Sequence, residues 1–128
     1  MQNLHIPAIY EQLPEVLFNA QIHKLSIAGV CIPEDSEVFF ESILKWLDAY
    51  LAWNQGDVTF KFQIVWFHDC CIPYFSKIFE KLSNHQKAGK GNVLVQFYHY
   101  EEDYDYKGEM LDWAEQFDFK NEFIAYQE

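Results

Sequence analysis

Residues 58–75 read VTFKFQIVWFHDCCIPYF, and within them the spacing of apolar side chains changes from that of a strand to that of a helix. From 58 to 67 polar and apolar side chains alternate with a period of two, which predicts a long β-strand. The alternation places Val58, Phe60, Phe62, Ile64 and Trp66 on one face, and Thr59, Lys61, Gln63, Val65 and Phe67 on the other. The second face becomes apolar toward its C-terminal end, as expected where a strand enters a sheet covered on both faces.

A change of period follows this strand directly. Pro73 suits the first turn of a helix, where its missing N–H costs little, and apolar residues then recur at helical spacing from 75 to 82. The helix is therefore predicted to begin between about 69 and 72. Asp69 could cap this helix, or it could place negative charge at the positive end of the helix dipole.

The segments on either side extend the pattern of strands and helices. Asp35 or Ser36 is the candidate cap of a helix with a wide apolar stripe, which ends near Gly56. The other predicted elements are a hairpin of strands at 16–19 and 24–28, a strand at 93–98, a helical stripe at 110–117 and a strand at 123–126. Strands that alternate with helices favour parallel neighbours. The sequence predicts a small α/β fold with a mixed, largely parallel sheet of about four to five strands and about three helices, in one domain over residues 1–128.

Composition restricts the possible functions. Of the 128 residues, 50% are hydrophobic and 19% aromatic, which is typical of a folded chain. Nine lysines, no arginine and 20 acidic residues give a formal net charge of −11. A nucleic-acid groove needs clustered cations, and an arginine-based phosphate site needs its fork of donors, so both are excluded. An acidic surface favours a basic protein partner instead.

The remaining whole-chain features predict a cytoplasmic bacterial protein. No apolar run approaches the length of a membrane span, and residues 1–20 lack the basic start and apolar block of a secretion signal. Membrane insertion is therefore not expected. The three cysteines, Cys31, Cys70 and Cys71, are an odd number with two adjacent, which indicates reduced thiols.

The run His68, Asp69, Cys70 and Cys71 raises the alternative of a thiol- or metal-dependent enzyme. Four consecutive residues cannot all face one metal ion, and Cys31 or His99 could join them only by an accident of the fold. Asp69 opposes thiolate formation, and the sequence lacks a glycine-rich oxyanion or phosphate loop. No metal or cofactor site is therefore predicted. An enzyme using His68, Cys70 and Cys71 remains the second hypothesis.

The acidic segment EEDYDYKG at 101–108 resembles a calcium loop only superficially. It lacks the ligand periodicity and the glycine of an EF-hand, so a solvated loop is the better interpretation. Tyrosines alternate from 98 to 106 beside these acids and could form part of a protein-binding rim.

Taken together, three segments make the chain resemble the SiaC family of bacterial regulatory phosphoproteins. They are IPEDSEVFFESILKWLDAYL at 32–51, FKFQIVWF at 60–67 and VLVQFYHYEEDYDYKGEMLDWAEQF at 93–117. The resemblance covers nearly the whole chain, and the order and spacing of the segments carry it. It implies a STAS-like (SpoIIAA-like) fold.

The resemblance also implies a switch protein without enzymatic activity. Members of the family are phosphorylated by a partner kinase and dephosphorylated by a PPM-type phosphatase. In the unphosphorylated form they bind and activate a diguanylate cyclase, which raises cyclic di-GMP and favours aggregation or biofilm.

The acceptor hydroxyl of this family follows the Tyr-Phe end of the strand, in a segment like Asn-Thr-Ser-Ser. Trp66 and Phe67 match Tyr-Phe, and His68 matches the asparagine. Asp69 then occupies the position of the acceptor threonine, while the serines are replaced by cysteines. The resemblance therefore makes Asp69 the phospho-acceptor equivalent, and the expected partner-binding residues are Phe67, His68, Asp69, Cys70, Cys71 and Ser76.

This departure from the family leaves two interpretations open, because residues 68–73 carry no hydroxyl. Asp69 could imitate the phosphorylated state in part, since a carboxylate carries one charge and a phosphate up to about two. Alternatively the protein is unregulated at this position and binds its partner constitutively, with Asp69 acting only as a helix cap.

Overall fold

The computed structural model describes residues 1–100 and 107–126. Three helices, a short 3₁₀ turn and six strands follow one another along this part of the chain. They are β1 (Leu4–Ile6), β2 (Glu15–Asn19), β3 (Lys24–Cys31), α1 (Ser36–Trp53), β4 (Val58–Phe67), η1 (Asp69–Cys71), α2 (Ile72–Lys87), β5 (Val93–Tyr100), α3 (Lys107–Gln116) and β6 (Lys120–Tyr126).

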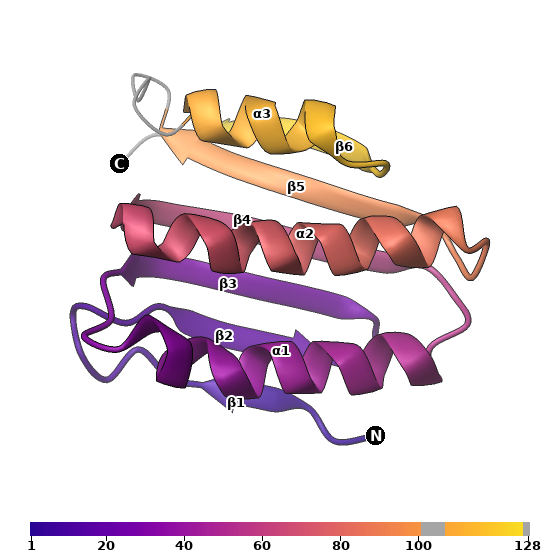
Figure 1. The fold of residues 1–128 in the computed structure, drawn as a ribbon, viewed down its shortest axis with the longest axis horizontal. Helices are drawn as coiled ribbons and strands as arrows, with labels where there is room; N and C mark the ends of the chain where they lie inside the picture. Colours follow the sequence, from indigo (N-terminus) through magenta and orange to yellow (C-terminus); the bar gives the residue numbers. More distant parts are fainter. Residues whose placement is uncertain (101–106, 127–128) are drawn as a thin grey trace.

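The six strands form a single mixed sheet in the order β1-β2-β3-β4-β5-β6. β1, β2 and β3 pair antiparallel, whereas β3 with β4, β4 with β5 and β5 with β6 pair parallel, each across one helix (Figure 1). This confirms the predicted α/β fold and the hairpin. The strand count is six rather than four to five, because β1 has only three residues and was not predicted from the sequence.

The α1 helix begins as its sequence requires. The Asp35 carboxylate accepts a hydrogen bond from the Val38 backbone N–H at 3.2 Å, which makes Asp35 rather than Ser36 the N-cap. The buried face comprises Phe40, Ile43, Leu47, Tyr50 and Leu51, and the other two residues of the predicted stripe, Phe39 and Leu44, are half-buried. Within the described residues, no helix combines the length and apolar character needed to cross a membrane.

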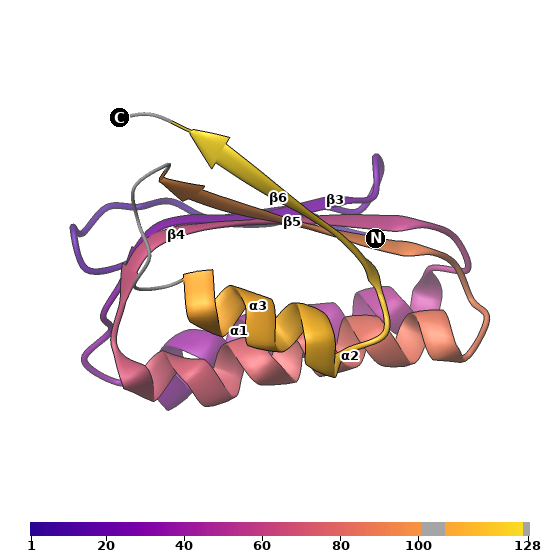
Figure 2. The same cartoon turned by 90° about the horizontal axis from the view of Figure 1, so that it is seen from above.

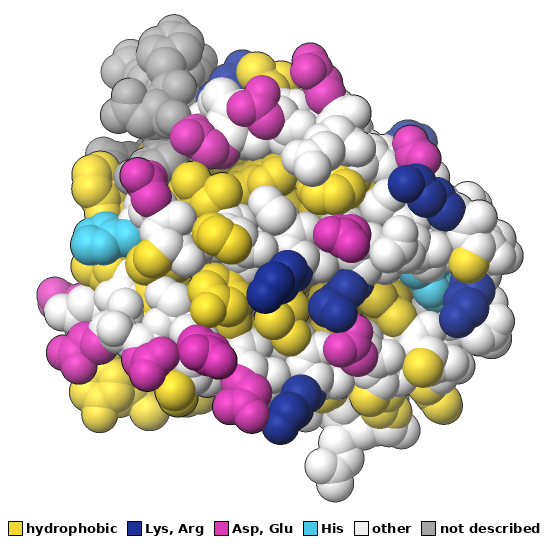
Figure 3. Space-filling view, viewed as in Figure 1, with side chains coloured by type: hydrophobic (Ala, Val, Ile, Leu, Met, Phe, Trp, Pro, Cys, Tyr) yellow, Lys and Arg dark blue, Asp and Glu magenta, His cyan; other side chains and the backbone are white. Residues whose placement is uncertain are grey.

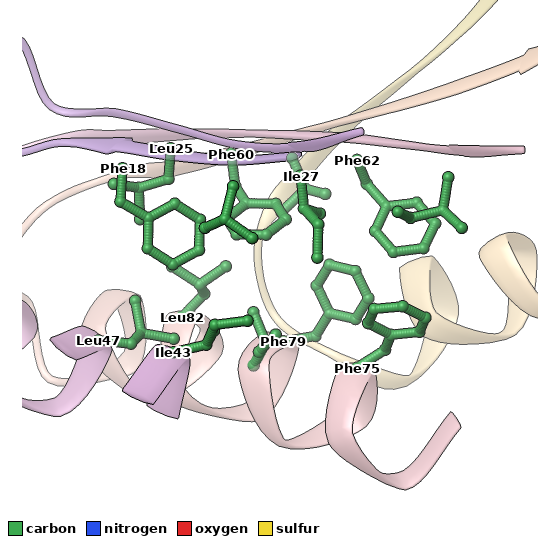
Figure 4. Packing of buried hydrophobic residues seen from close by; sticks show 14 of the residues in the cluster. Phe18, Leu25, Ile27, Ile43, Leu47, Phe60, Phe62, Phe75, Phe79 and Leu82 are labelled. Atoms are coloured by element: carbon green, nitrogen blue, oxygen red, sulfur yellow. The ribbon is translucent and has the colours of Figure 1, made fainter. Parts of the chain in front are cut away.

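The core fills the space between the helices and one face of the sheet (Figure 4). Phe62 of β4 lies at its centre, with ring centroids 5.0 Å from Phe75, 5.6 Å from Phe79 and 5.6 Å from Trp113. Burying one such aromatic side chain contributes about 2–3 kcal/mol. The period-two face from Val58 to Ile64 is buried as predicted.

At the C-terminal end of β4 the alternation breaks. Gly29 of β3 pairs with Ile64, but the next residue, Val30, pairs with Trp66, so Val65 has no partner in this register. Such a bulge inserts one residue and reverses the faces that follow. The sequence-based assignment is therefore wrong here: Trp66 is 51% exposed and Phe67 only 4% exposed.

The expectation of a sheet covered on both faces is also wrong. The three helices lie on one side of the sheet, and no described helix covers the other side (Figure 2). This open face carries mainly polar residues, with Lys61 placed 4.6 Å over the Tyr98 ring. The bulge explains why residues 64–67 are all apolar: after it, Phe67 instead of Trp66 faces the core.

Candidate functional site

The junction between β4 and α2 is tied to the end of β3. The His68 N–H donates to the Cys31 carbonyl oxygen at 3.3 Å, and the Cys71 N–H donates to the His68 carbonyl oxygen at 2.9 Å. The second bond closes the η1 turn, and α2 follows with Pro73 in its first turn. The predicted strand-to-helix junction and helix start are confirmed.

Asp69 lies in this turn with its side chain exposed. It does not act as a cap: the N-cap residues are His68 for η1 and Cys71 for α2, and neither helix start has a side-chain capping bond. The capping prediction is wrong because the 3₁₀ turn separates Asp69 from the first residue of α2. Asp69 also does not fall in the first turn of α2, which contains no acidic residue; its charge lies in the η1 turn that precedes this helix.

Two of the three thiols meet beneath the turn. Cys31 Sγ and Cys71 Sγ lie 3.5 Å apart, both side chains are fully buried, and Cys71 Sγ donates to the Cys31 carbonyl oxygen at 3.3 Å. The hydrogen bond with Cys71, together with burial, raises the pKa of the Cys31 thiol far above its ordinary value. Cys70 is exposed, and its sulfur accepts a hydrogen bond from Ser36 Oγ at 3.2 Å. Cys31 therefore does reach the junction, 40 residues away along the chain.

The residues expected to bind a partner differ in exposure. His68, Asp69 and Cys70 are exposed, whereas Phe67 and Cys71 are buried and can only position their neighbours. Ser76 is partly buried, and its Oγ accepts a hydrogen bond from Trp113 Nε1 at 3.0 Å. Residues 66–70 line a shallow hollow of about 450 Å³ beside the turn.

The start of α1 lies against this turn through the contact between Ser36 and Cys70. We call residues 34–37 and 68–70 together the junction surface. Four exposed carboxylates belong to it, and neither segment contains a lysine; the four are Glu34, Asp35, Glu37 and Asp69. Figure 3 shows acidic side chains gathered over the first part of α1, with lysines mainly over the middle and the opposite end of this face.

These two segments lie more than 30 residues apart in the sequence and meet only in the fold. The available signal was that both precede helices that follow parallel strands. Helices that follow neighbouring parallel strands begin at the same end of the sheet. The acidic residues at 34–37 and at 69 are therefore expected to lie close together.

The other candidate ligands do not assemble with the junction. His99 is 8% exposed, and its Nδ1 lies 3.0 Å from the Tyr100 carbonyl oxygen. Within residues 1–100 and 107–126, no group of three His, Cys, Asp or Glu side chains is placed to hold a metal ion. Residues 101–106 of the acidic segment lie outside the described residues.

The fold is shared with solved structures from Pseudomonas aeruginosa. Apo-SiaC matches with a TM-score of 0.86 and 22% identity over 98% of this chain and 100% of that one. SiaC in the crystal structure of the diguanylate cyclase SiaD with its activator SiaC matches with a TM-score of 0.89 and 20% identity, over 96% and 99%.

Sequence comparison extends this relationship. An uncharacterised protein of Pseudomonas aeruginosa strain UCBPP-PA14 is 25% identical over 90 residues, which are 70% of this chain and 71% of the relative. The profile of the SiaC family regulatory phosphoproteins matches residues 8–126. The chain belongs to the SiaC family of regulatory phosphoproteins.

Proposed function

We propose that this protein is a non-enzymatic regulator that binds a partner protein through the junction surface. The observation that carries the proposal is the set of four exposed carboxylates without a lysine, at the edge where β4 meets α2. The partner is expected to present lysines or arginines to this edge, because opposite charges speed association and fix orientation. We further propose that residues 1–128 form a single SiaC-type domain and that the protein acts in the cytoplasm.

The proposed partner is a diguanylate cyclase, so that the output is cyclic di-GMP and, through it, biofilm or aggregation. Support comes from membership of the SiaC family and from the related SiaC, which is the activator of the cyclase SiaD in their crystal structure.

Control by a kinase and a PPM-type phosphatase is not proposed for the turn itself. Residues 68–73 contain no hydroxyl that a kinase could phosphorylate. Nearby hydroxyls are already hydrogen-bonded, Ser36 to Cys70 and Ser76 to Trp113. We therefore propose that partner binding through this turn is constitutive.

Replacing Asp69 by lysine is expected to weaken binding to the cognate cyclase about tenfold or more. The change reverses one of four charges on the junction surface and should mainly slow association. The measurement is the dissociation constant by surface plasmon resonance at two salt concentrations. The loss should shrink at high salt, since exposed charges are screened.

Glu122→Lys provides the matched control. Glu122 is exposed on β6, where its register neighbour Gln96 belongs to the open face of the sheet, and the same change in net charge occurs away from the junction. Its affinity should stay within about twofold of wild type. Equal losses for both variants would mean that overall charge, rather than the junction surface, governs binding.

Incubation with the cognate kinase and ATP is expected to leave residues 66–76 without a phosphate. Intact mass and peptide mapping test this directly. An Asp69→Thr variant restores a hydroxyl in the exposed turn and should gain a phosphate at that residue if the kinase still docks. A phosphate on Ser36 or Ser76 of the wild type would contradict the proposed constitutive state.

The thiol- or metal-dependent enzyme is the weaker candidate. Cys71 is buried, and His68 and Cys70 are neighbouring exposed residues that the structure does not enclose in a deep pocket. Thiol-reagent kinetics at Cys70 clearly faster than those of a cysteine peptide would favour this candidate instead.

A further inference from the structure

We propose that Cys31 and Cys71 form a modification site: a peroxide converts this buried thiol pair into a reversible disulfide that links the end of β3 to the turn before α2. The two thiols are buried beneath the junction surface and are not part of it, and the proposal stands whether or not the protein binds a cyclase.

The geometry holds the two sulfur atoms together in the folded chain. Their separation is 3.5 Å, and a disulfide needs about 2 Å, so a small approach of the side chains is sufficient. Two backbone hydrogen bonds link the residues indirectly, from His68 N–H to the Cys31 carbonyl and from Cys71 N–H to the His68 carbonyl. The pair is thus pre-positioned although 40 residues separate it in the sequence.

The third thiol has a different environment. Cys70 is exposed, and its sulfur accepts a hydrogen bond from Ser36. A bond between adjacent cysteines would distort the peptide unit between them, so Cys70 and Cys71 are a poor pair. Cys31 is therefore the partner that the fold provides for Cys71.

The reaction balances with a peroxide as the oxidant. The Cys71 thiolate attacks one peroxide oxygen, the O–O bond breaks, and the products are a sulfenic acid and hydroxide. The Cys31 sulfur then attacks the Cys71 sulfur, the S–O bond breaks, and the proton from the Cys31 thiol leaves with the hydroxyl group as water. The proton that Cys71 lost in forming the thiolate converts the hydroxide to water, so both sulfurs are oxidised and both peroxide oxygens end as water.

Two features support this order of attack. The hydrogen bond with Cys31 lowers the pKa of Cys71, while the same bond and burial raise the pKa of Cys31, so Cys71 becomes the thiolate first. Access requires only a local opening of η1. This turn has three residues and no side-chain cap, and short 3₁₀ turns of this kind open more easily than the core.

The test uses the full-length protein and hydrogen peroxide. After the reaction, the protein is unfolded in the presence of an alkylating reagent that blocks all remaining free thiols, and peptides are mapped by mass spectrometry. The expected product is a peptide pair joined through Cys31 and Cys71, lighter by two hydrogen atoms, with Cys70 alkylated or singly oxidised. Dithiothreitol should restore all three thiols. If Cys31 and Cys71 stay alkylatable in the unfolded sample, or if Cys70 is part of the disulfide, the proposal is wrong.

Comparison with the unfolded chain isolates the contribution of the fold. In urea the link between Cys31 and Cys71 should form more slowly by about tenfold or more, because its thiols are no longer held in contact. A Cys70→Ala variant should still form the link, because Cys70 is not one of the two sulfurs that are joined. A rate in urea equal to the native rate, or loss of the link in Cys70→Ala, would overturn the assignment.

Discussion

Replacing Gly91 by alanine is expected to lower the free energy of unfolding by about 3 kcal/mol. A Cβ at this position would overlap the carbonyl group of Gly56, and it would lie 3.0 Å from the backbone nitrogen of Asp57. The obstacle is backbone, so no side chain can rotate away to make room.

Moving the Gly56 carbonyl oxygen would also break hydrogen bonds. This oxygen accepts a hydrogen bond from Asn54 Nδ2 at 3.1 Å and lies 2.9 Å from His85 Nε2. Beside it, the Asn92 N–H donates to Asp57 Oδ1 at 2.9 Å. Any shift that relieves the overlap would break bonds that set the starts of β4 and β5 side by side.

Gly108→Ala is the matched control. Gly108 lies in the first turn of α3, and apart from its chain neighbours and the backbone of its own helix no atom of the described residues lies within 4 Å of the position that an added Cβ would take. Because alanine favours helix, this variant should gain up to about 0.5–1 kcal/mol. Urea unfolding followed by circular dichroism measures both changes. Similar stabilities for the two variants would contradict the close approach of Gly91 to Gly56.

The arrangement of helices and strands was predictable because most elements have one buried face. The stripe on α1 and the alternation from Val58 to Ile64 identify their elements from residue types alone. β1 was not predictable in the same way. Its three residues, Leu4–Ile6, are too few for a period, and only pairing with β2 makes them a strand.

The candidate site was less predictable, for a physical reason. The position of the junction followed from Pro73 and the end of the strand pattern. The pairing of Cys31 with Cys71 depends on sheet register, which includes a bulge and joins residues 40 apart. The sequence around Val65 is apolar on both sides, so residue types could not reveal where the extra residue lies.

The bulge at the C-terminal end of β4 can be tested by substitution of the two residues that follow it. Phe67→Ala is expected to cost about 3–5 kcal/mol, the range for removing a buried aromatic side chain. The Phe67 ring lies 5.5 Å from Phe75 and 6.3 Å from Trp113, and it is 4% exposed. Uninterrupted alternation from Val58 predicts the opposite, with Trp66 in the core and Phe67 outside.

Trp66→Ala therefore serves as the paired variant, and its expected cost is about 1 kcal/mol or less because half of the side chain is already exposed. Urea titrations of both variants against wild type measure the difference. The comparison of the two losses in stability is the decisive result, because Trp66 is the larger side chain and its removal should nevertheless have the smaller effect. If Trp66→Ala proved the more destabilising, β4 would continue without the bulge, and the side chains of His68 and Asp69 would also change faces. Such an outcome would remove Asp69 from the junction surface. The stability of these two variants thus decides whether the proposed binding surface exists in the form described.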